Sequence, residues 1–269
     1  MRALFVTVLA LLAPLVASPA IVPDPGGAGA WAVGAAPLAD APGPLALFDQ
    51  PARVQADGGA RVALAAQRTR LFELDALARV RAALAVTRTS YTLALGVETF
   101  GPAAARSSRV VLGAALARAG TRVGAAWSER RGPVPGGRAG ALDAALAARL
   151  PGAGGLVRAQ LSARGLLSGG DPGAAAEPDW TAEVALDLGP ARAHLARTRD
   201  LHGARTGGGV ALGTARLSLA VGAIGPPLSW TIGFGIGGAT GKGGARAAFA
   251  RVVHPVLGAS DVVEGGVSW

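Results

Sequence analysis

The sequence predicts an all-β protein: a closed, antiparallel transmembrane β-barrel of about 14 strands with an N-terminal lumen or periplasmic segment. Three features of the chain favour this fold class. Large apolar residues alternate with small or polar ones, the alternating segments are even in number, and the links between them are short and long in turn. Each feature is a known property of bacterial single-chain barrels.

The alternation is clearest near the end of the chain. From 228 to 237, every even position is large and apolar and every odd position is Ser, Thr or Gly. A period of two places all the bulk on one face of a strand. Val263, Val267 and Trp269 continue the pattern to the last residue. Bacterial outer-membrane barrels commonly end on such an aromatic residue.

Fourteen segments show this apolar stripe. They lie at residues 62–66, 80–86, 91–97, 110–116, 123–127, 142–148, 157–163, 180–188, 191–195, 210–212, 217–221, 228–237, 245–249 and 263–269. An even count is what a bacterial single-chain barrel requires. Residues 75–86 and 140–150 also fit amphipathic helices, since Ala, Leu and Arg favour helices, so a soluble periplasmic β-rich or α+β domain remains an alternative.

The links alternate in length. We expect short turns near 88–90, 119–120, 151–154, 189–190 and 214–216, and longer loops at 68–76, 101–108, 129–139, 165–179 and 200–208. Short periplasmic turns and long outer loops produce this alternation when the first strand runs outward. The pattern weakens at 225–227, where an outer link is of modest length.

This topology predicts where the aromatic and the charged residues lie in the barrel. Trp127, Trp180 and Trp230 fall at the outer interface, and Tyr91 and Trp269 at the periplasmic one, as two aromatic girdles. The opposite strand faces carry charges that are costly against lipid but acceptable inside a barrel. The predicted lumen-lining residues are Arg79, Arg81, Glu98, Arg122, Arg158, Glu183, Asp187, Arg192, His194 and Glu264.

Composition narrows the function classes. The chain has 269 residues, of which 51% are hydrophobic but only 4% are aromatic. Large aromatic side chains are therefore too few to fill the core of a soluble protein of this size. It has 41 Gly and no Cys, so disulfides, thiolate zinc sites and cysteine nucleophiles are excluded. The net charge of +9 comes almost wholly from scattered Arg, which argues against a nucleic-acid-binding stripe.

The chain divides into three parts. Residues 1–20 predict a secretory signal peptide, because the basic Arg2, a short apolar core and Ser18-Pro19-Ala20 follow one another. Residues 21–59 form a Gly/Pro/Ala-rich lumen segment, and residues 60–269 form the barrel. The apolar core of the signal is too short for a spanning helix. Export then predicts an outer-membrane location in a Gram-negative cell.

Two stretches carry a resemblance to a known family. The first is Gly29-Ala30-Trp31-Ala32-Val33-Gly34, then Leu38-Ala39-Asp40-Ala41-Pro42 and Leu47-Phe48-Asp49-Gln50-Pro51-Ala52; the second is His254-Pro255-Val256-Leu257-Gly258. They resemble the PorV/PorQ family and FadL-like outer-membrane proteins, although Gln50 stands where that family usually has Asn, and a second Asp after Asp40 is lacking. The resemblance implies a barrel of about fourteen strands whose N-terminal segment sits in or under the lumen.

Motifs for chemistry are weak. Residues 237–243 depart from a P-loop, since Ile236 replaces Gly and Lys242 is followed by Gly, so a hairpin turn is expected. His194, His202 and His254 lack metal-type spacing, and no context singles out one Ser for a Ser/His/Asp set. Glu183 and Asp187 could sit against Arg158 and Arg192 as a charge-paired lumen wall, with ligand or ion selectivity as the alternative.

We therefore expect a non-enzymatic protein without cofactor or metal, in contact with outer-membrane lipid and not with nucleic acid. The resemblance implies transport of small hydrophobic molecules, which predicts an apolar lumen pocket near residues 29–52. The alternatives are a PorV-like role in binding or shuttling a secreted protein in a type IX-like system, and a soluble periplasmic β-rich binding protein.

Overall fold

The computed structural model describes residue 32 and residues 43–56, 61–132, 137–152, 155–171, 178–200, 203–214, 216–240 and 243–269. These residues form fourteen strands. They are β1 (Val62–Arg70), β2 (Ala78–Arg88), β3 (Tyr91–Phe100), β4 (Ser107–Arg118), β5 (Thr121–Arg131), β6 (Arg138–Gly152), β7 (Gly155–Gly170), β8 (Asp179–Leu188), β9 (Ala191–Asp200), β10 (Gly203–Gly213), β11 (Leu217–Gly225), β12 (Ser229–Thr240), β13 (Gly243–His254) and β14 (Gly258–Ser268).

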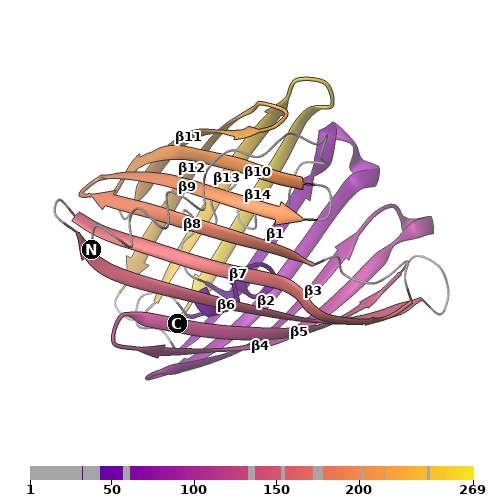
Figure 1. Cartoon of the computed structure of the whole chain (residues 1–269), viewed down its shortest axis with the longest axis horizontal. Helices are drawn as coiled ribbons and strands as arrows, with labels where there is room; N and C mark the ends of the chain where they lie inside the picture. The colour runs from indigo at the N-terminus through magenta and orange to yellow at the C-terminus, as the bar shows by residue number, and fades with distance from the viewer. Residues whose placement is uncertain are drawn as a thin grey trace.

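The strands form one closed barrel in which every neighbour in sequence is also a neighbour in space (Figure 1). All pairs are antiparallel, and the barrel closes where β1 pairs with β14 from Ala63↔Ser268 to Arg70↔Asp261. An ion pair of 3.0 Å between Arg70 and Asp261 lies at the end of this seam away from the short turns. The predicted closed antiparallel barrel of about fourteen strands is confirmed.

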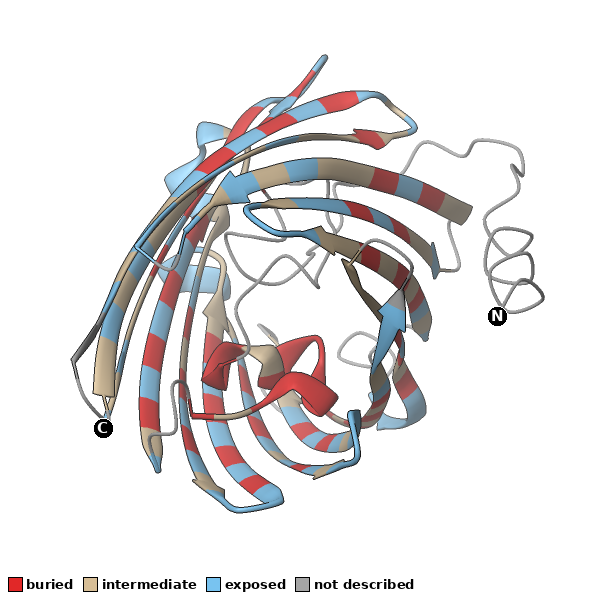
Figure 2. Cartoon of the chain, turned by 90° about the vertical axis from the view of Figure 1, so that its left-hand side faces the viewer, coloured by how far each residue is buried: buried red, intermediate tan, exposed pale blue. Residues whose placement is uncertain are grey.

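The two faces of the wall differ sharply. Large apolar side chains such as Leu93, Leu112 and Ile232 stand exposed on the outside, while Ala, Gly and polar side chains face inward and are mostly buried. Figure 2 shows the resulting alternation of buried and exposed residues along the strands. A soluble domain would cover its apolar face with a second layer, so this structure excludes the two-layer soluble alternative.

Both helical alternatives are wrong. Residues 140–150 lie within β6, and residues 78–86 lie within β2, where only Asp75–Leu77 form one turn of 3₁₀ helix (η6) before the strand begins. Strand pairing satisfies the backbone of these Ala-rich segments along both edges, and this tertiary pairing overrides their helix propensity. Within the described residues, no helix is long and apolar enough to cross a membrane.

The link lengths follow the predicted alternation as far as β9, with two corrections. The loop expected at 165–179 begins later, because β7 continues to Gly170. The loop expected at 200–208 is wrong, because β9 ends at Asp200 and β10 begins at Gly203. The glycines at 207–209 lie inside β10, where they continue the ladder with β9. Glycine weakens a strand but does not interrupt its hydrogen bonds.

Two short 3₁₀ helices lie inside the ring of strands. They are η2 (Pro44–Phe48) and η3 (Pro51–Arg53), and Figure 2 shows them against one side of the wall. Further 3₁₀ turns, η5 (Leu71–Glu73), η6 and η7 (Ala103–Ala105), lie in outer loops. Proline opens both η2 and η3, as its fixed φ and missing N–H allow. We call residues 43–56 the plug.

A bulge bends the wall between β6 and β7. Pairing shifts from Leu142↔Leu167 to Ala144↔Ala163, so three residues of β7 oppose Asp143. Gly165, in the middle of the three, has a φ of 63°, a conformation that favours glycine. The buried Asp143 carboxylate accepts a hydrogen bond of 2.8 Å from the Gly165 N–H and one of 2.9 Å from Arg109. Asp143 therefore completes the ladder where β7 bulges.

Replacing Asp143 should destabilise the barrel. Asp143→Ala leaves the buried Arg109 guanidinium and the Gly165 N–H without this acceptor, and loss of one partner of a buried pair costs about 3–5 kcal/mol. Urea unfolding in lipid vesicles measures the change. Asp171→Ala removes an exposed acceptor of the Arg138 N–H and should change the unfolding free energy by no more than ~0.5 kcal/mol. Equal effects of the two substitutions would contradict this role of Asp143.

Candidate functional site

The apolar side of the plug is packed into the inner wall. Leu47, Phe48 and Val54 are fully buried and form one cluster with inward-facing residues of the wall, which include Ala65, Ala83, Ala85, Ala94, Val111 and Ala126. Small wall residues make room for the plug. A Cβ at Gly96 would lie 2.7 Å from Phe48 Cζ, and one at Gly113 would overlap Leu47.

The plug backbone touches the wall directly at Gly124 of β5. A Cβ built at this position would overlap the carbonyl carbon of Pro51 and the nitrogen of Ala52. Further along, the Ala56 N–H donates to Thr87 Oγ1 of β2 over 2.8 Å. Since Gly124 and Thr87 lie near the turns that end β4 and β2, residues 51–56 of the plug lie towards the end of the barrel where these short turns are.

One carboxylate joins the plug to two distant strands. Asp49 Oδ2 accepts from Arg81 of β2 over 3.0 Å, and Asp49 Oδ1 accepts from Arg164 of β7 over 3.0 Å. Arg81 also lies over the Phe48 ring, 5.0 Å from its centroid. Asp49 and Arg81 are both buried, where ion pairs are little screened. We call this Asp49–Arg81–Arg164 contact the latch.

Other acids extend the latch around the lumen. Glu98 accepts from Arg81 over 2.6 Å, and Asp179 lies 2.5 Å from Arg164. Further inward pairs are Arg79–Glu98, Arg109–Asp143, Arg158–Asp187, Arg205–Asp200 and Arg246–Glu264. Buried guanidinium groups require such partners, and the wall supplies them, mostly from adjacent strands and for Arg109 from the next strand but one.

The predicted lumen-lining residues all lie on inward positions of their strands. Asp187 contacts both Arg158, at 2.8 Å, and Arg192, at 3.4 Å. Glu183 contacts His194 instead, at 3.3 Å, with neither side chain exposed. Arg192 is the most exposed of the set. The remaining members are Arg79, Arg81, Glu98, Arg122 and Glu264, all buried or partly buried.

The five interface aromatics stand on the outer face. Tyr91, Trp127, Trp180, Trp230 and Trp269 are 41–65% exposed. The Trp127 ring covers Gly140 of the adjacent strand, since a Cβ there would lie 2.5 Å from Trp127 Cζ2. Trp180 and Trp230 are each the second residue of a strand, at the end of the barrel where loop 171–178 lies.

Several charged residues of the interior were absent from the sequence-based set. Arg109, Arg130, Asp143, Arg149, Arg164 and Arg246 all occupy inward positions, and the period of two already indicates this orientation. Arg205 was assigned to a loop. Asp49 was noted only as part of the N-terminal motif, and nothing local in the sequence indicates that it contacts strands β2 and β7.

The remaining motifs have structural roles where they are described. His254 Nδ1 accepts from the N–H groups of Val256 and Leu257, so it caps the turn before β14. Thr240 pairs with Gly243, which makes the glycine-rich stretch a hairpin, as predicted. Lys242, His202 and the predicted signal peptide at residues 1–20 lie outside the described residues. In the described part of the chain, no cluster of three or more His, Asp or Glu could hold a metal.

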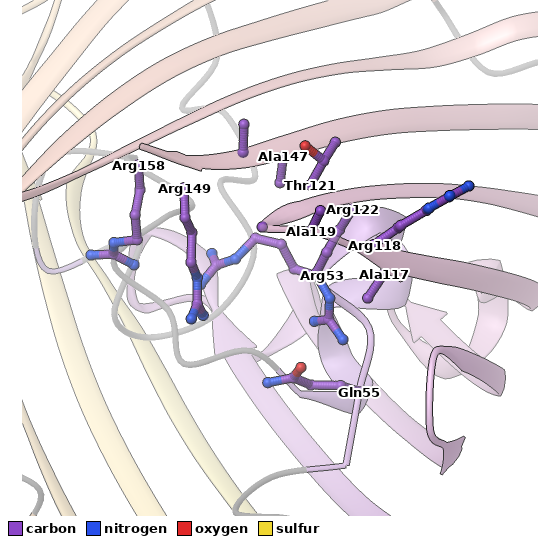
Figure 3. Close-up of a pocket in the computed structure, with 12 residues that line it drawn as sticks. Arg53, Gln55, Ala117, Arg118, Ala119, Thr121, Arg122, Ala147, Arg149 and Arg158 are labelled. Atoms are coloured by element: carbon purple, nitrogen blue, oxygen red, sulfur yellow. The ribbon is translucent and has the colours of Figure 1, made fainter. Parts of the chain in front are cut away.

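Two cavities flank the plug. One, of about 350 Å³, lies beside Pro44 and is lined mainly by Gly, Ala and Val of β1, β12, β13 and β14. The other, of about 320 Å³, lies between the plug and the turns of β4–β5 and β6–β7 and is rich in Arg (Figure 3). The first is apolar apart from Arg246 and Ser268, and it adjoins the described part of residues 29–52, where an apolar pocket was expected.

The architecture matches solved structures of transport proteins. The toluene transporter TbuX of Ralstonia pickettii superposes with a TM-score of 0.53 at 10% identity, over 90% of this chain and 96% of that chain. A deletion mutant of the monoaromatic hydrocarbon channel TodX gives 0.54 at 12% identity, over 90% and 97%. This chain shares their fold. No protein-family model matches the sequence, and no curated protein matches it either.

A substitution in the barrel wall should displace the plug. Gly124→Val forces a side chain into the Pro51–Ala52 backbone, so we expect the plug to leave this part of the wall while the ladder stays paired. The chain has no cysteine, so an added Ala52→Cys reports the change by maleimide labelling. The introduced thiol should be protected when Gly124 is kept and labelled in the Gly124→Val background.

Gly169→Val is the matched control, because a Cβ there meets no atom within 4 Å, and the thiol of Ala52→Cys should stay protected in it. Equal protection of this thiol in all three backgrounds would show that the plug does not rest on Gly124.

Proposed function

We propose that this protein is an outer-membrane channel for small hydrophobic molecules, in which the plug closes the lumen and the latch holds it. The observation that carries the proposal is the combination of a closed barrel, an apolar outer face and an interior filled by a segment of the chain itself. The shared fold with a toluene transporter and a monoaromatic hydrocarbon channel supports the same interpretation.

The outer face fits a bilayer. Every strand has at least nine residues, and a tilted transmembrane strand needs about 9–11. Exposed Val and Leu would meet lipid, while Tyr91 and Trp269 at one end and Trp127, Trp180 and Trp230 towards the other would form the aromatic girdles of such barrels. Backbone groups are paired around a closed sheet, as a membrane interior requires.

The cavity beside Pro44 is the candidate place for an apolar cargo. Its volume of about 350 Å³ falls in the range of small-molecule sites, which are mostly apolar with a few polar groups. Its walls are Gly and Ala of β1 and β12–β14, and Pro44 belongs to the plug, so a bound molecule would touch both. Movement of the plug would then change the shape of the site.

A second candidate is the binding or shuttling of a secreted protein. The observation in its favour is the end of β7 beyond Arg164, which pairs with β6 but has no second neighbour among the described residues, since β7 pairs with β8 only as far as Arg164. Leu166 and Leu167 in this part are 52% and 65% exposed. Replacing Leu166 and Leu167 by Ser should abolish protein binding in this case and leave hydrocarbon uptake unchanged in the channel case.

Uptake of toluene tests the proposed cargo class. A Gram-negative host expressing the protein should take up labelled toluene several-fold faster than the same host without it, because the lipopolysaccharide leaflet slows apolar solutes. Gly266→Val, which fills the cavity beside Pro44, should reduce the rate, and Gly169→Val should not. Uptake equal to that of the empty host, with the barrel correctly inserted, would reject the channel for this cargo.

The latch should control leakage through the lumen. Asp49→Ala removes both contacts to Arg81 and Arg164, each worth about 1.5–3 kcal/mol as a hydrogen bond to a charged group, so the plug should leave more often. Ion conductance in planar bilayers should rise over the parent. Asp75→Ala, which removes an exposed acid paired with Arg68 at 3.6 Å, should leave conductance unchanged. Equal conductance of parent and Asp49→Ala would rule out the latch.

Lipid contact predicts a depth-dependent cost of charge on the outer face. Leu95→Arg, at the middle of β3, should destabilise the barrel in vesicles by about 2–4 kcal/mol. Val80→Arg, close to the outer end of β2, should cost about 0–1 kcal/mol. Both side chains are equally exposed, at 47%, so a soluble protein would show the same small cost at both positions in urea unfolding.

A further inference from the structure

The Arg-rich cavity of about 320 Å³ lies where the plug meets the wall at the end with the short turns. Arg53 comes from η3, Arg122 from the start of β5, Arg149 from β6 and Arg158 from β7. Figure 3 shows Arg149 and Arg158 side by side, with Arg53 extending toward them and Gln55 below. Arg118 points away from this group. Four guanidinium groups therefore line one small space.

Two members of this cluster lack the carboxylate partners that most arginines of the interior have. Elsewhere, Arg81, Arg109, Arg164, Arg205 and Arg246 each contact a carboxylate of the wall or plug. Among the described residues, Arg122 and Arg149 form no ion pair, and they lie close enough to repel each other. Their repulsion and the partial burial of Arg122 both disfavour two bare cations here. An anion between them would remove this cost.

We propose that this cavity binds a small soluble oxyanion, a compound with a phosphate or carboxylate group, between the plug and the wall. The guanidinium fork matches both groups in bidentate geometry, and Gln55 adds an amide donor. The volume suits a group the size of phosphate or a small carboxylic acid. It is small for a protein segment and lies at the bottom of the range for ligand sites.

The source of the anion is the aqueous phase and not a lipid headgroup. Arg122, Arg149 and Arg158 occupy inward positions of their strands, and Arg53 is buried on the plug. A headgroup anchored in the surrounding bilayer would meet the outer face of the wall, where Arg118 lies at an exposed outward position.

The bound anion has a mechanical consequence. It would bridge Arg53 of the plug to Arg122, Arg149 and Arg158 of the wall. The oxyanion then fixes the C-terminal part of the plug, while Asp49 fixes its middle. This inference does not depend on a hydrophobic cargo.

Calorimetric titration with inorganic phosphate tests the site, with the full-length mature protein in phosphatidylcholine nanodiscs at low ionic strength, where charge interactions are least screened. The parent should bind one phosphate per barrel, with a matching rise in the temperature at which the barrel loses its folded gel mobility. Arg122→Gln/Arg149→Gln should weaken binding by about a hundredfold, since it removes two contacts to a charged group and each costs about one power of ten. This double variant breaks no ion pair of the described residues, so it should fold.

Arg61→Gln/Arg88→Gln removes the same charge from exposed positions at the same end of the barrel and should bind phosphate like the parent. A third arm replaces part of the phosphatidylcholine by phosphatidylglycerol in phosphate-free buffer, and the parent should gain no stability there. The proposal is overturned if the parent binds no phosphate, if the cavity double variant binds as tightly as the parent, or if only the phosphatidylglycerol discs stabilise it.

Discussion

Closure of the hydrogen-bonded ladder is the constraint on which the structure depends. A strand in lipid has no water for its N–H and C=O groups, so each needs a neighbouring strand on both sides. Fourteen antiparallel strands meet this need when β14 returns to β1. Closure in turn defines an inside and an outside, and the period of two then assigns every side chain of a strand to one of them. The polar interior is thus a direct result of pairing the backbone.

The interior is stabilised by electrostatics and by close packing together. Inward alanines and glycines leave space beside the wall, and Leu47 and Phe48 fill it from the plug. Arginines on adjacent strands are held by carboxylates, and Asp49 brings a charge from the plug into this network. A hydrophobic segment and a charged wall are therefore compatible, because the plug presents its apolar side chains to alanines and its one acid to arginines.

The sequence predicts the wall better than its contents. The fourteen segments and the orientation of residues such as Arg81, Glu98 and His194 follow from a period of two, which is a local property. The bulge at Asp143 could not be predicted, because it arises from the pairing of two strands. The Asp49–Arg164 contact joins residues 115 apart in sequence, and no local pattern encodes it. The glycines in β10 were wrongly predicted as a loop. Glycine is typical of loops, and the sequence around these residues does not indicate that they pair with β9.

The position of the seam bears on how the molecule is made. Because β1 and β14 are the two ends of the meander, β1 and β13 each lack one neighbour until β14 is added. A nascent barrel consequently keeps two open edges until its final strand arrives, and open edges attract other chains. The two edges must therefore be shielded until the last eleven residues of the ladder have paired.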